Sequence, residues 1–295
     1  MHIEEISPAV RISPLAAPMG AEVLNLDLST LDAPGWFDIV EQALHQYRVL
    51  VIRNQRIDDG QLLRFSKFFG DELDIHAMTQ FAKPDNPEIF VLSNIVEDGR
   101  QIGAVDAAQY WHSDLCYTRT PSRISVLYAL EVPVKGGKVL GPTDFADTAA
   151  AYYALPADMK KRLEGLQARF VASKKKPSQR TSHFNKMDNA TQQRLEESVV
   201  HPVIRTHPYT AEKSIYVNHG FTTEILDIDP AESERLLDYL FAHTTQPQFV
   251  YRHQWAAGDV VLWDNALTLH QGVGDYALPQ RRLLYRAIVK GTAPY

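Results

Sequence analysis

The sequence His112-Ser113-Asp114 decides the fold together with WDNALTLH at residues 263–270, which ends in His270. Two histidines and one carboxylate in this order form the ligand set of a facial metal triad, which suits Fe(II) and leaves the opposite face of the ion open for a co-substrate and O₂. Residues two apart on a strand project to the same side, so we expect His112 and Asp114 to share one strand. The third ligand is expected from a distant strand, to which the apolar run 260–263 leads. The competing interpretation is that these are ordinary histidines, since the chain has 11 of them.

Two arginines follow the last of these histidines. Arg282 and Arg286 lie four residues apart in an apolar stretch that predicts a strand over 283–289, and positions an even number apart face the same way. If that strand lines the metal cavity, two guanidinium groups enter it, and each can hold a carboxylate or a sulfonate through two parallel hydrogen bonds. Buried arginines without anions are costly, so two anions are implied. The neighbouring Arg281 is expected on the surface.

Further motifs accompany the metal and arginine residues along the chain. They are GAEV at 20–23, YRVLVIRNQ at 47–55, FSKFFG at 65–70, WHSD at 111–114, YVNHGFT at 216–222, WDN at 263–265, DY at 275–276 and PQRR at 279–282. In their order and spacing, nearly the whole chain resembles the Fe(II)- and 2-oxoglutarate-dependent dioxygenases of the taurine dioxygenase and 2,4-dichlorophenoxyacetate dioxygenase (TauD/TfdA) family. The C-terminal third is most similar to the taurine dioxygenases.

The resemblance implies a role for each of eight residues. His112, Asp114 and His270 would bind iron and form the catalytic centre, Arg282 and Thr143 would bind 2-oxoglutarate, and Arg286, His76 and Phe221 would bind the prime substrate. Arg286 would hold the acidic group of that substrate.

Two departures from the family pattern concern the ligands. The family places the threonine almost directly after a Gly-Gly pair, whereas five residues separate Gly137 from Thr143 here. We interpret the extra residues as a bulged loop rather than a lost site. Thr79 and the stretch Ala108-Gln109-Tyr110 also differ from what a taurine binder would carry, which argues against taurine itself.

The function implied by the resemblance is hydroxylation of a small anionic substrate with release of succinate and CO₂. An organosulfonate is the favoured substrate. The same chemistry on an aryloxyalkanoate, or on an amino-acid-derived specialised metabolite, is the first alternative. The remote alternative is a non-catalytic jelly-roll binding protein.

Composition narrows the class of protein and its partners. A chain of 295 residues with 45% hydrophobic content is long enough for one large core, so we expect a single domain over 1–295. A net charge of −6 gives no support for nucleic-acid binding, and no apolar run approaches the ~18 residues of a membrane span. The acidic start has no apolar run typical of a signal peptide, so we expect no secretory signal, and a single cysteine fits the expected reducing cytoplasm. That cysteine, Cys116, is expected to be buried and structural. The oligomeric state is left open, a homo-oligomer included.

The periodicity of apolar residues predicts a mainly β fold with flanking helices. Helices are expected at 36–47, 61–69, 149–154, 157–166 and 231–244, and strands at 49–52, 89–92, 123–130, 214–217, 249–251, 259–263 and 283–289. Short strands between polar turns favour a jelly-roll barrel, and the family fold is the same double-stranded β-helix of the cupin type. Residues 173–189 are poor in apolar side chains and predict a mobile active-site loop, with Ser182, His183 and Phe184 facing the pocket.

Overall fold

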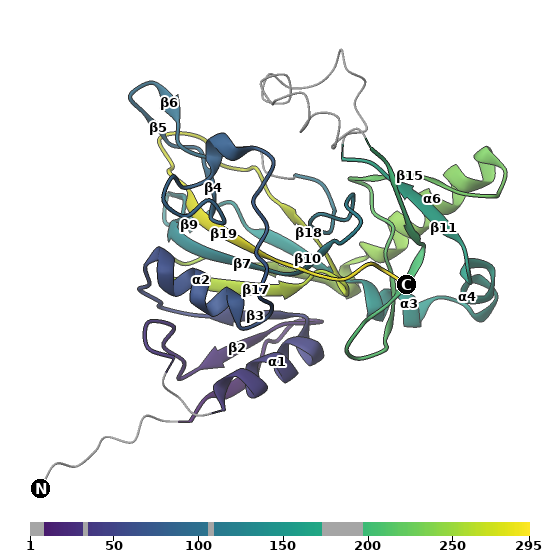
Figure 1. Cartoon of the computed structure of the whole chain (residues 1–295), viewed down its shortest axis with the longest axis horizontal. Coiled ribbons are helices and arrows are strands. Elements are labelled where there is room, and N and C mark those ends of the chain that lie inside the picture. Colours follow the sequence, from purple (N-terminus) through teal and green to yellow (C-terminus); the bar gives the residue numbers. More distant parts are fainter. Residues whose placement is uncertain (1–8, 32–34, 106–108, 173–196) are drawn as a thin grey trace, which may run out of the picture.

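A seven-stranded sheet forms the centre of the molecule. The computed structural model describes residues 9–31, 35–105, 109–172 and 197–295 (Figure 1). The order of the strands in this sheet is β1 (Arg11–Pro14), β2 (Ala21–Leu24), β3 (Val49–Ile52), β17 (Val260–Asp264), β7 (Ser122–Glu131), β19 (Leu283–Lys290) and β4 (Phe90–Ser93). All neighbouring pairs are antiparallel except β2 and β3, which are parallel.

The central strands of this sheet are buried on both faces. In β17, Val260 and Leu262 pack into one apolar cluster, whereas Val261 and Trp263 pack into another. This alternation follows from the two-residue period of a strand. The first cluster lies beneath α1 (Trp36–Tyr47) and α2 (Asp59–Lys67), which cover one face of the sheet in Figure 1.

A three-stranded sheet covers the other face and carries part of the site. Its strands are β16 (Val250–His253), β10 (Thr143–Asp147) and β18 (Thr268–Gly272), with β10 in the middle. Phe145 of β10 packs on Trp263 of β17 with ring centroids 5.3 Å apart, which joins the two sheets through the second apolar cluster. The predicted metal and 2-oxoglutarate site therefore forms where the two sheets face each other.

The remaining elements build a third apolar cluster beside the two sheets, on the right of Figure 1. They are α3 (Thr148–Ala154), α4 (Ala157–Leu163), β11 (Gln167–Phe170), β12 (Val199–Pro202), β13 (Ile204–Thr206), β14 (Lys213–Ile215), β15 (Thr222–Ile225), α6 (Pro230–Thr244) and η4 (Pro247–Phe249). The short pieces η1 (Thr79–Phe81), β5 (Val96–Glu97), β6 (Arg100–Gln101), β8 (Val134–Lys135) and β9 (Lys138–Val139) complete the described chain. No helix within the described ranges is long and apolar enough to cross a membrane.

The structure confirms a mainly β fold with flanking helices and corrects three expectations. His112 and Asp114 do not share a strand, because His112 forms only an isolated bridge with His270 and Asp114 starts a turn. The apolar run 260–263 does not lead into the strand of His270: it forms β17, which ends at Asp264, and His270 lies on the next strand, β18. The first two residues after Gly137 form β9, which pairs with β8 in a tight hairpin rather than a bulged loop, with Gly136 and Gly137 at positive φ in its turn. The predicted loop at 173–189, with Ser182, His183 and Phe184, lies outside the described residues.

One prediction for stability concerns the start of α6. The exposed carboxylate of Asp229 accepts hydrogen bonds from the backbone of Ala231 and Glu232, at 3.0 and 3.1 Å. Asp229→Ala is therefore expected to lower the free energy of unfolding by about 1 kcal/mol, as measured by urea denaturation. Asp238→Ala, which removes an exposed carboxylate from the middle of the same helix, is the control and should leave stability unchanged or slightly raised. Equal losses in the two variants would contradict the capping role.

Candidate metal centre

Two distant segments bring three potential ligands together. The backbones of His112 and His270 exchange two hydrogen bonds of 3.0 and 2.8 Å, and their rings lie 4.1 Å apart. Asp114 completes the group, with Oδ1 at 3.7 Å from His112 Nε2 and Oδ2 at 3.8 Å from His270 Nε2. All three side chains are buried, and their donor atoms lie within 4.8 Å of one another. This arrangement can hold one metal ion through two nitrogens and a carboxylate.

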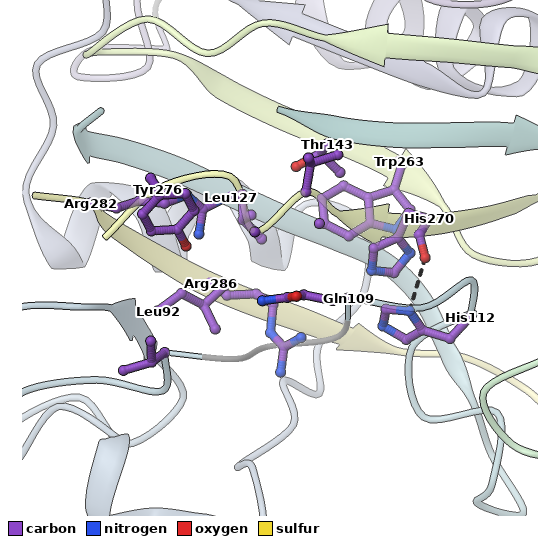
Figure 2. A pocket seen from close by; sticks show the side chains of 14 residues that line it. Leu92, Gln109, His112, Leu127, Thr143, Trp263, His270, Tyr276, Arg282 and Arg286 are labelled. Atoms are coloured by element: carbon purple, nitrogen blue, oxygen red, sulfur yellow. Dashed lines mark hydrogen bonds between the residues drawn. The ribbon is translucent and has the colours of Figure 1, made fainter. Parts of the chain in front are cut away.

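The protonation of the three groups also suits a metal ion. His112 Nδ1 lies 3.0 Å from the carbonyl oxygen of Tyr110 and 2.9 Å from that of His270 (Figure 2). A carbonyl only accepts, so Nδ1 carries the ring proton and Nε2 is left with a lone pair toward Asp114. Burial, reinforced by the neighbouring His112, holds the pKa of His270 well below its ordinary value. Metal binding requires neutral imidazoles, and burial therefore already favours this form in His270.

Asp114 carries the negative charge of the group. Burial by itself would raise the pKa of this carboxyl, but Arg286, His270 and His112 together hold it well below its ordinary value. Arg286 Nη1 donates a hydrogen bond of 3.1 Å to Asp114 Oδ1. The anion that accompanies Arg286 in this structure is thus Asp114 itself, whereas the sequence led us to expect two external anions.

Arg282 lies in the same cavity and has a different environment. It precedes β19 by one residue, so the expectation that both arginines lie on the strand is right for Arg286 only. Its side chain is 9% exposed, its Cζ lies 5.6 Å from the ring centre of Tyr276, and no salt bridge within the described part of the chain involves it. Burial lowers the pKa of Arg282, while Tyr276 opposes this shift. A buried guanidinium without a carboxylate is a strong binding site for an anionic ligand.

An open cavity of about 570 Å³ of empty space connects these groups. Figure 2 shows Arg282 and Tyr276 at one end, His112 and His270 at the other, and Arg286 and Gln109 between them. Apolar side chains from three strands of the seven-stranded sheet also line it, namely Leu92, Leu127 and Trp263. The cavity can accept an elongated ligand that reaches from the metal ligands to Arg282.

Thr143 lines this cavity as the first residue of β10. Its hydroxyl oxygen accepts a 3.0 Å hydrogen bond from Trp255 Nε1, so its own proton can be donated into the cavity. Gly141, which no sequence pattern marked, has positive φ and packs closely under Tyr276, where an added Cβ would come within 2.9 Å of the ring. Tyr276 was marked only as part of a short motif. Thr143 therefore lines the same cavity as His112 and His270 despite the extra residues after Gly137.

The two other residues expected to bind the prime substrate lie beside the cavity rather than among its lining residues. The ring of His76 packs on Phe90 at 4.1 Å, and Phe90 in turn lies 5.1 Å from the guanidinium carbon of Arg286. Burial, aided by the charge of Arg286, lowers the pKa of His76 to about 3, so this histidine is neutral at neutral pH. Phe221 packs behind the His112 ring, with centroids 5.8 Å apart.

Cys116 is fully buried, as the sequence predicts. Its Sγ accepts a hydrogen bond from Asn218 Nδ2 at 3.4 Å, and burial raises the pKa of the thiol to about 12. The thiol lies in the third apolar cluster and does not line the cavity.

A second group of potential ligands, His45, His207 and Asp264, lies elsewhere in the fold. His207 Nδ1 accepts from the backbone N–H of Thr210, so Nε2 carries the proton that it donates to Asp264 Oδ2 at 2.9 Å. The second oxygen of Asp264 accepts from the backbone of Ala266. These bonds satisfy His207 and Asp264 internally, so the pair ties the β13–β14 hairpin to the end of β17.

Comparisons with known proteins agree on one group. A family model described as "Taurine catabolism dioxygenase TauD, TfdA family" matches residues 11–288. Pentalenolactone F synthase of Streptomyces arenae is 33% identical over 88% of this chain and 89% of its own length. The (S)-phenoxypropionate/alpha-ketoglutarate-dioxygenase of Sphingobium herbicidovorans is 34% identical over 97% and 96%, respectively. The crystal structure of AAD-2 with Mn(II) and N-oxalylglycine superposes with a TM-score of 0.78 at 31% identity, covering 97% of this chain and 99% of that one.

Proposed function

The chain belongs to the TauD, TfdA family of dioxygenases, and from this premise we propose that it hydroxylates a small organic anion at a centre formed by His112, Asp114 and His270. Family membership makes it an alpha-ketoglutarate-dependent oxidoreductase that uses Fe(II) and O₂. The alternative that the chain is a non-catalytic jelly-roll binding protein, which the sequence left open, is therefore wrong. We regard residues 1–295 as one catalytic domain, in which the two facing sheets are the halves of a double-stranded β-helix.

The three proposed ligands fit an iron ion. They offer two imidazoles and one buried carboxylate held in its charged form, which is the donor set that Fe(II) oxygenases use. Bound Fe(II) supplies the activation of O₂ that is coupled to oxidative decarboxylation of 2-oxoglutarate to succinate and CO₂. The protein's own contribution is to orient both substrates and to keep bulk water from the centre.

The observation that carries the proposal is the position of Arg282. Its buried guanidinium has no salt bridge among the described residues and faces the same cavity as the three ligands. A dicarboxylate that reaches the metal ligands with one end would place its other carboxylate at this guanidinium. We assign Arg282 and the hydroxyl of Thr143 to 2-oxoglutarate on this basis.

Arg286 is proposed to hold the acidic group of the prime substrate. It lines the cavity between the three proposed metal ligands and Arg282, and its buried Nε has no hydrogen-bond partner among the residues that the structure describes. His76 and Phe221 would support this subsite from behind, through Phe90 and His112. An organosulfonate is the first candidate substrate. An aryloxyalkanoate is the second, because a relative covering nearly the whole chain is named as a phenoxypropionate dioxygenase; amino-acid-derived acids complete the substrate panel.

A substrate panel with matched anions tests this proposal. Succinate formation would be measured with Fe(II), ascorbate and 2-oxoglutarate, with each candidate sulfonate paired with the carboxylate of the same carbon skeleton and with its neutral amide. We expect turnover with acids and none with the amides, because only an anion pairs with Arg286. Equal turnover of acid and amide would overturn the anionic-substrate assignment. Absence of succinate with every compound would overturn the proposal as a whole.

The two arginines are predicted to be separable by mutation. Arg286→Ala should raise the KM of the prime substrate by at least about tenfold, since loss of a charge-assisted hydrogen bond costs ~1.5–3 kcal/mol. It should leave 2-oxoglutarate binding to the Fe(II) enzyme nearly intact, as measured by anaerobic titration of the metal-to-ligand charge-transfer band. Because Arg286 also bonds Asp114, Fe(II) affinity is measured first and should not fall. Loss of the band to the same extent as in Arg282→Ala would show that both arginines serve one anion.

A further inference from the structure

The carboxylate of Asp114 is held by two residues to which neither the sequence motifs nor the proposed function gives a role. Its Oδ2 accepts a 2.6 Å hydrogen bond from the hydroxyl of Ser125, and its backbone N–H donates to Asn265 Oδ1 at 3.1 Å. Ser125 lies on β7 and Asn265 follows β17, and both side chains are fully buried. Asp114 is therefore fixed by contacts to the central sheet.

The side chain of Asn265 makes hydrogen bonds in only one orientation. Its Oδ1 accepts from Asp114 N and from Trp263 Nε1, both at 3.1 Å, and its Nδ2 donates to Ser122 Oγ at 2.9 Å and to Ser125 Oγ at 3.0 Å. Rotating the amide by half a turn would set its NH₂ group against two N–H donors. All four hydrogen-bonding positions of the amide are thus used, and its direction is determined.

The direction of the amide in turn determines where the proton of Ser125 goes. Since Asn265 Nδ2 donates to Ser125 Oγ, that oxygen acts as an acceptor on this side, and its own hydrogen points to Asp114 Oδ2. Among the described residues, the other carboxylate oxygen, Oδ1, accepts a hydrogen bond from Arg286 alone, at the longer distance of 3.1 Å. Arg286 lines the open cavity, and a metal dication beside Oδ1 would repel its guanidinium. The Arg286–Oδ1 bond can therefore be exchanged for a metal ion, whereas the Ser125–Oδ2 bond is kept.

We propose that Ser125 and Asn265 are positioning residues that reserve Oδ2 of Asp114 for a hydrogen bond and present Oδ1 alone to the metal. The inference rests on the proposed iron triad. A carboxylate that binds through both oxygens takes two coordination positions, whereas the reaction needs three open positions for 2-oxoglutarate and O₂. The Ser125 hydroxyl keeps the third position free by making Asp114 a one-oxygen ligand.

The test compares Ser125→Ala with Ser122→Ala. Both serines lie on β7, and each has a buried hydroxyl that accepts a hydrogen bond from Asn265 Nδ2. Of the two, Ser125 alone donates to Asp114. Both enzymes are loaded anaerobically with Fe(II) and titrated with 2-oxoglutarate while the charge-transfer band is recorded. We expect Ser125→Ala to shift the band and to weaken 2-oxoglutarate binding by at least about fivefold without weakening Fe(II) binding, and Ser122→Ala to match the wild type. Ser125→Thr, which keeps the hydroxyl, should restore the wild-type band.

Asn265→Asp provides an independent variant if Ser125→Ala does not fold. It removes the Nδ2 donor and leaves an acceptor in its place, so the proton of Ser125 can turn away from Asp114. The same band shift is expected. Identical spectra and 2-oxoglutarate affinities for Ser125→Ala and Ser122→Ala, or a wild-type band in Asn265→Asp, would overturn the inference. If the wild type itself gives no band with Fe(II) and 2-oxoglutarate, the proposed function fails instead, so the two failures are distinguishable.

Discussion

Asp114→Ala is expected to abolish succinate formation and to weaken Fe(II) binding strongly. The substitution leaves two neutral imidazoles, which lack the anionic ligand that compensates the charge of the ion. It also leaves the buried guanidinium of Arg286 without the carboxylate that it bonds, at a place where a dication would have to bind. Both effects act against the metal, so the loss should be larger than for any other single change proposed for this protein.

Fe(II) and Mn(II) affinity and succinate production are the measurements for this variant. Asp259→Ala is the matched control, because it removes an equally buried carboxylate that bonds Arg53 away from the cavity. The control should lose stability and keep metal binding. Near wild-type turnover of Asp114→Ala would refute the assignment of the triad.

Arg282→Ala is expected to raise the KM for 2-oxoglutarate by at least about tenfold. The guanidinium is buried, and the anion proposed to bind it has no other cationic partner at that end of the cavity. Loss of such a charge-assisted pair costs ~1.5–3 kcal/mol. The dissociation constant of 2-oxoglutarate, from the charge-transfer band, should rise in parallel, because the interaction contributes to binding in the ground state.

The neighbouring Arg281 offers the control for this prediction. It is exposed, as expected from the sequence, and makes two hydrogen bonds of 2.8 and 2.9 Å to Glu131 on the surface. Arg281→Ala should leave the KM for 2-oxoglutarate unchanged. A raised KM in Arg281→Ala together with an unchanged KM in Arg282→Ala would identify Arg281 as the residue that binds 2-oxoglutarate and would refute the assignment to Arg282.

Local pattern predicted many of the elements around the site. The expected helix at 36–47 coincides with α1 because its buried residues, Trp36, Val40, Ala43 and Leu44, follow the spacing of one helical face. The strands β3, β7, β17 and β19 were predicted to within about two residues, since continuous apolar runs mark strands that are buried on both faces. The strands β10 and β18 were missed, although they carry Thr143 and His270. Polar residues in both strands interrupt the apolar pattern.

The contacts within the site could not be predicted from local sequence patterns. Asp114 accepts hydrogen bonds from Ser125, 11 residues away, and from Arg286, 172 residues away, and no spacing rule relates these positions. The sequence suggested two external anions for two arginines, and the structure pairs one arginine with the protein's own carboxylate. Ser125 looked like an ordinary polar residue of a strand. Its role follows only from the Asn265 amide on a neighbouring segment.

The sequence by itself determined which residue types are present for chemistry and which segments form the central sheet, because donor identity and apolar period are properties of the chain. The tertiary structure alone decided that His112 bridges to His270, that Arg282 has no salt bridge among the described residues, and that Asn265 directs the proton of Ser125 to Asp114. These outcomes depend on the register and facing of strands that are distant in sequence. Apolar burial specifies that such strands pack, but the direction of each polar hydrogen bond is fixed only when the partner from another strand is in place.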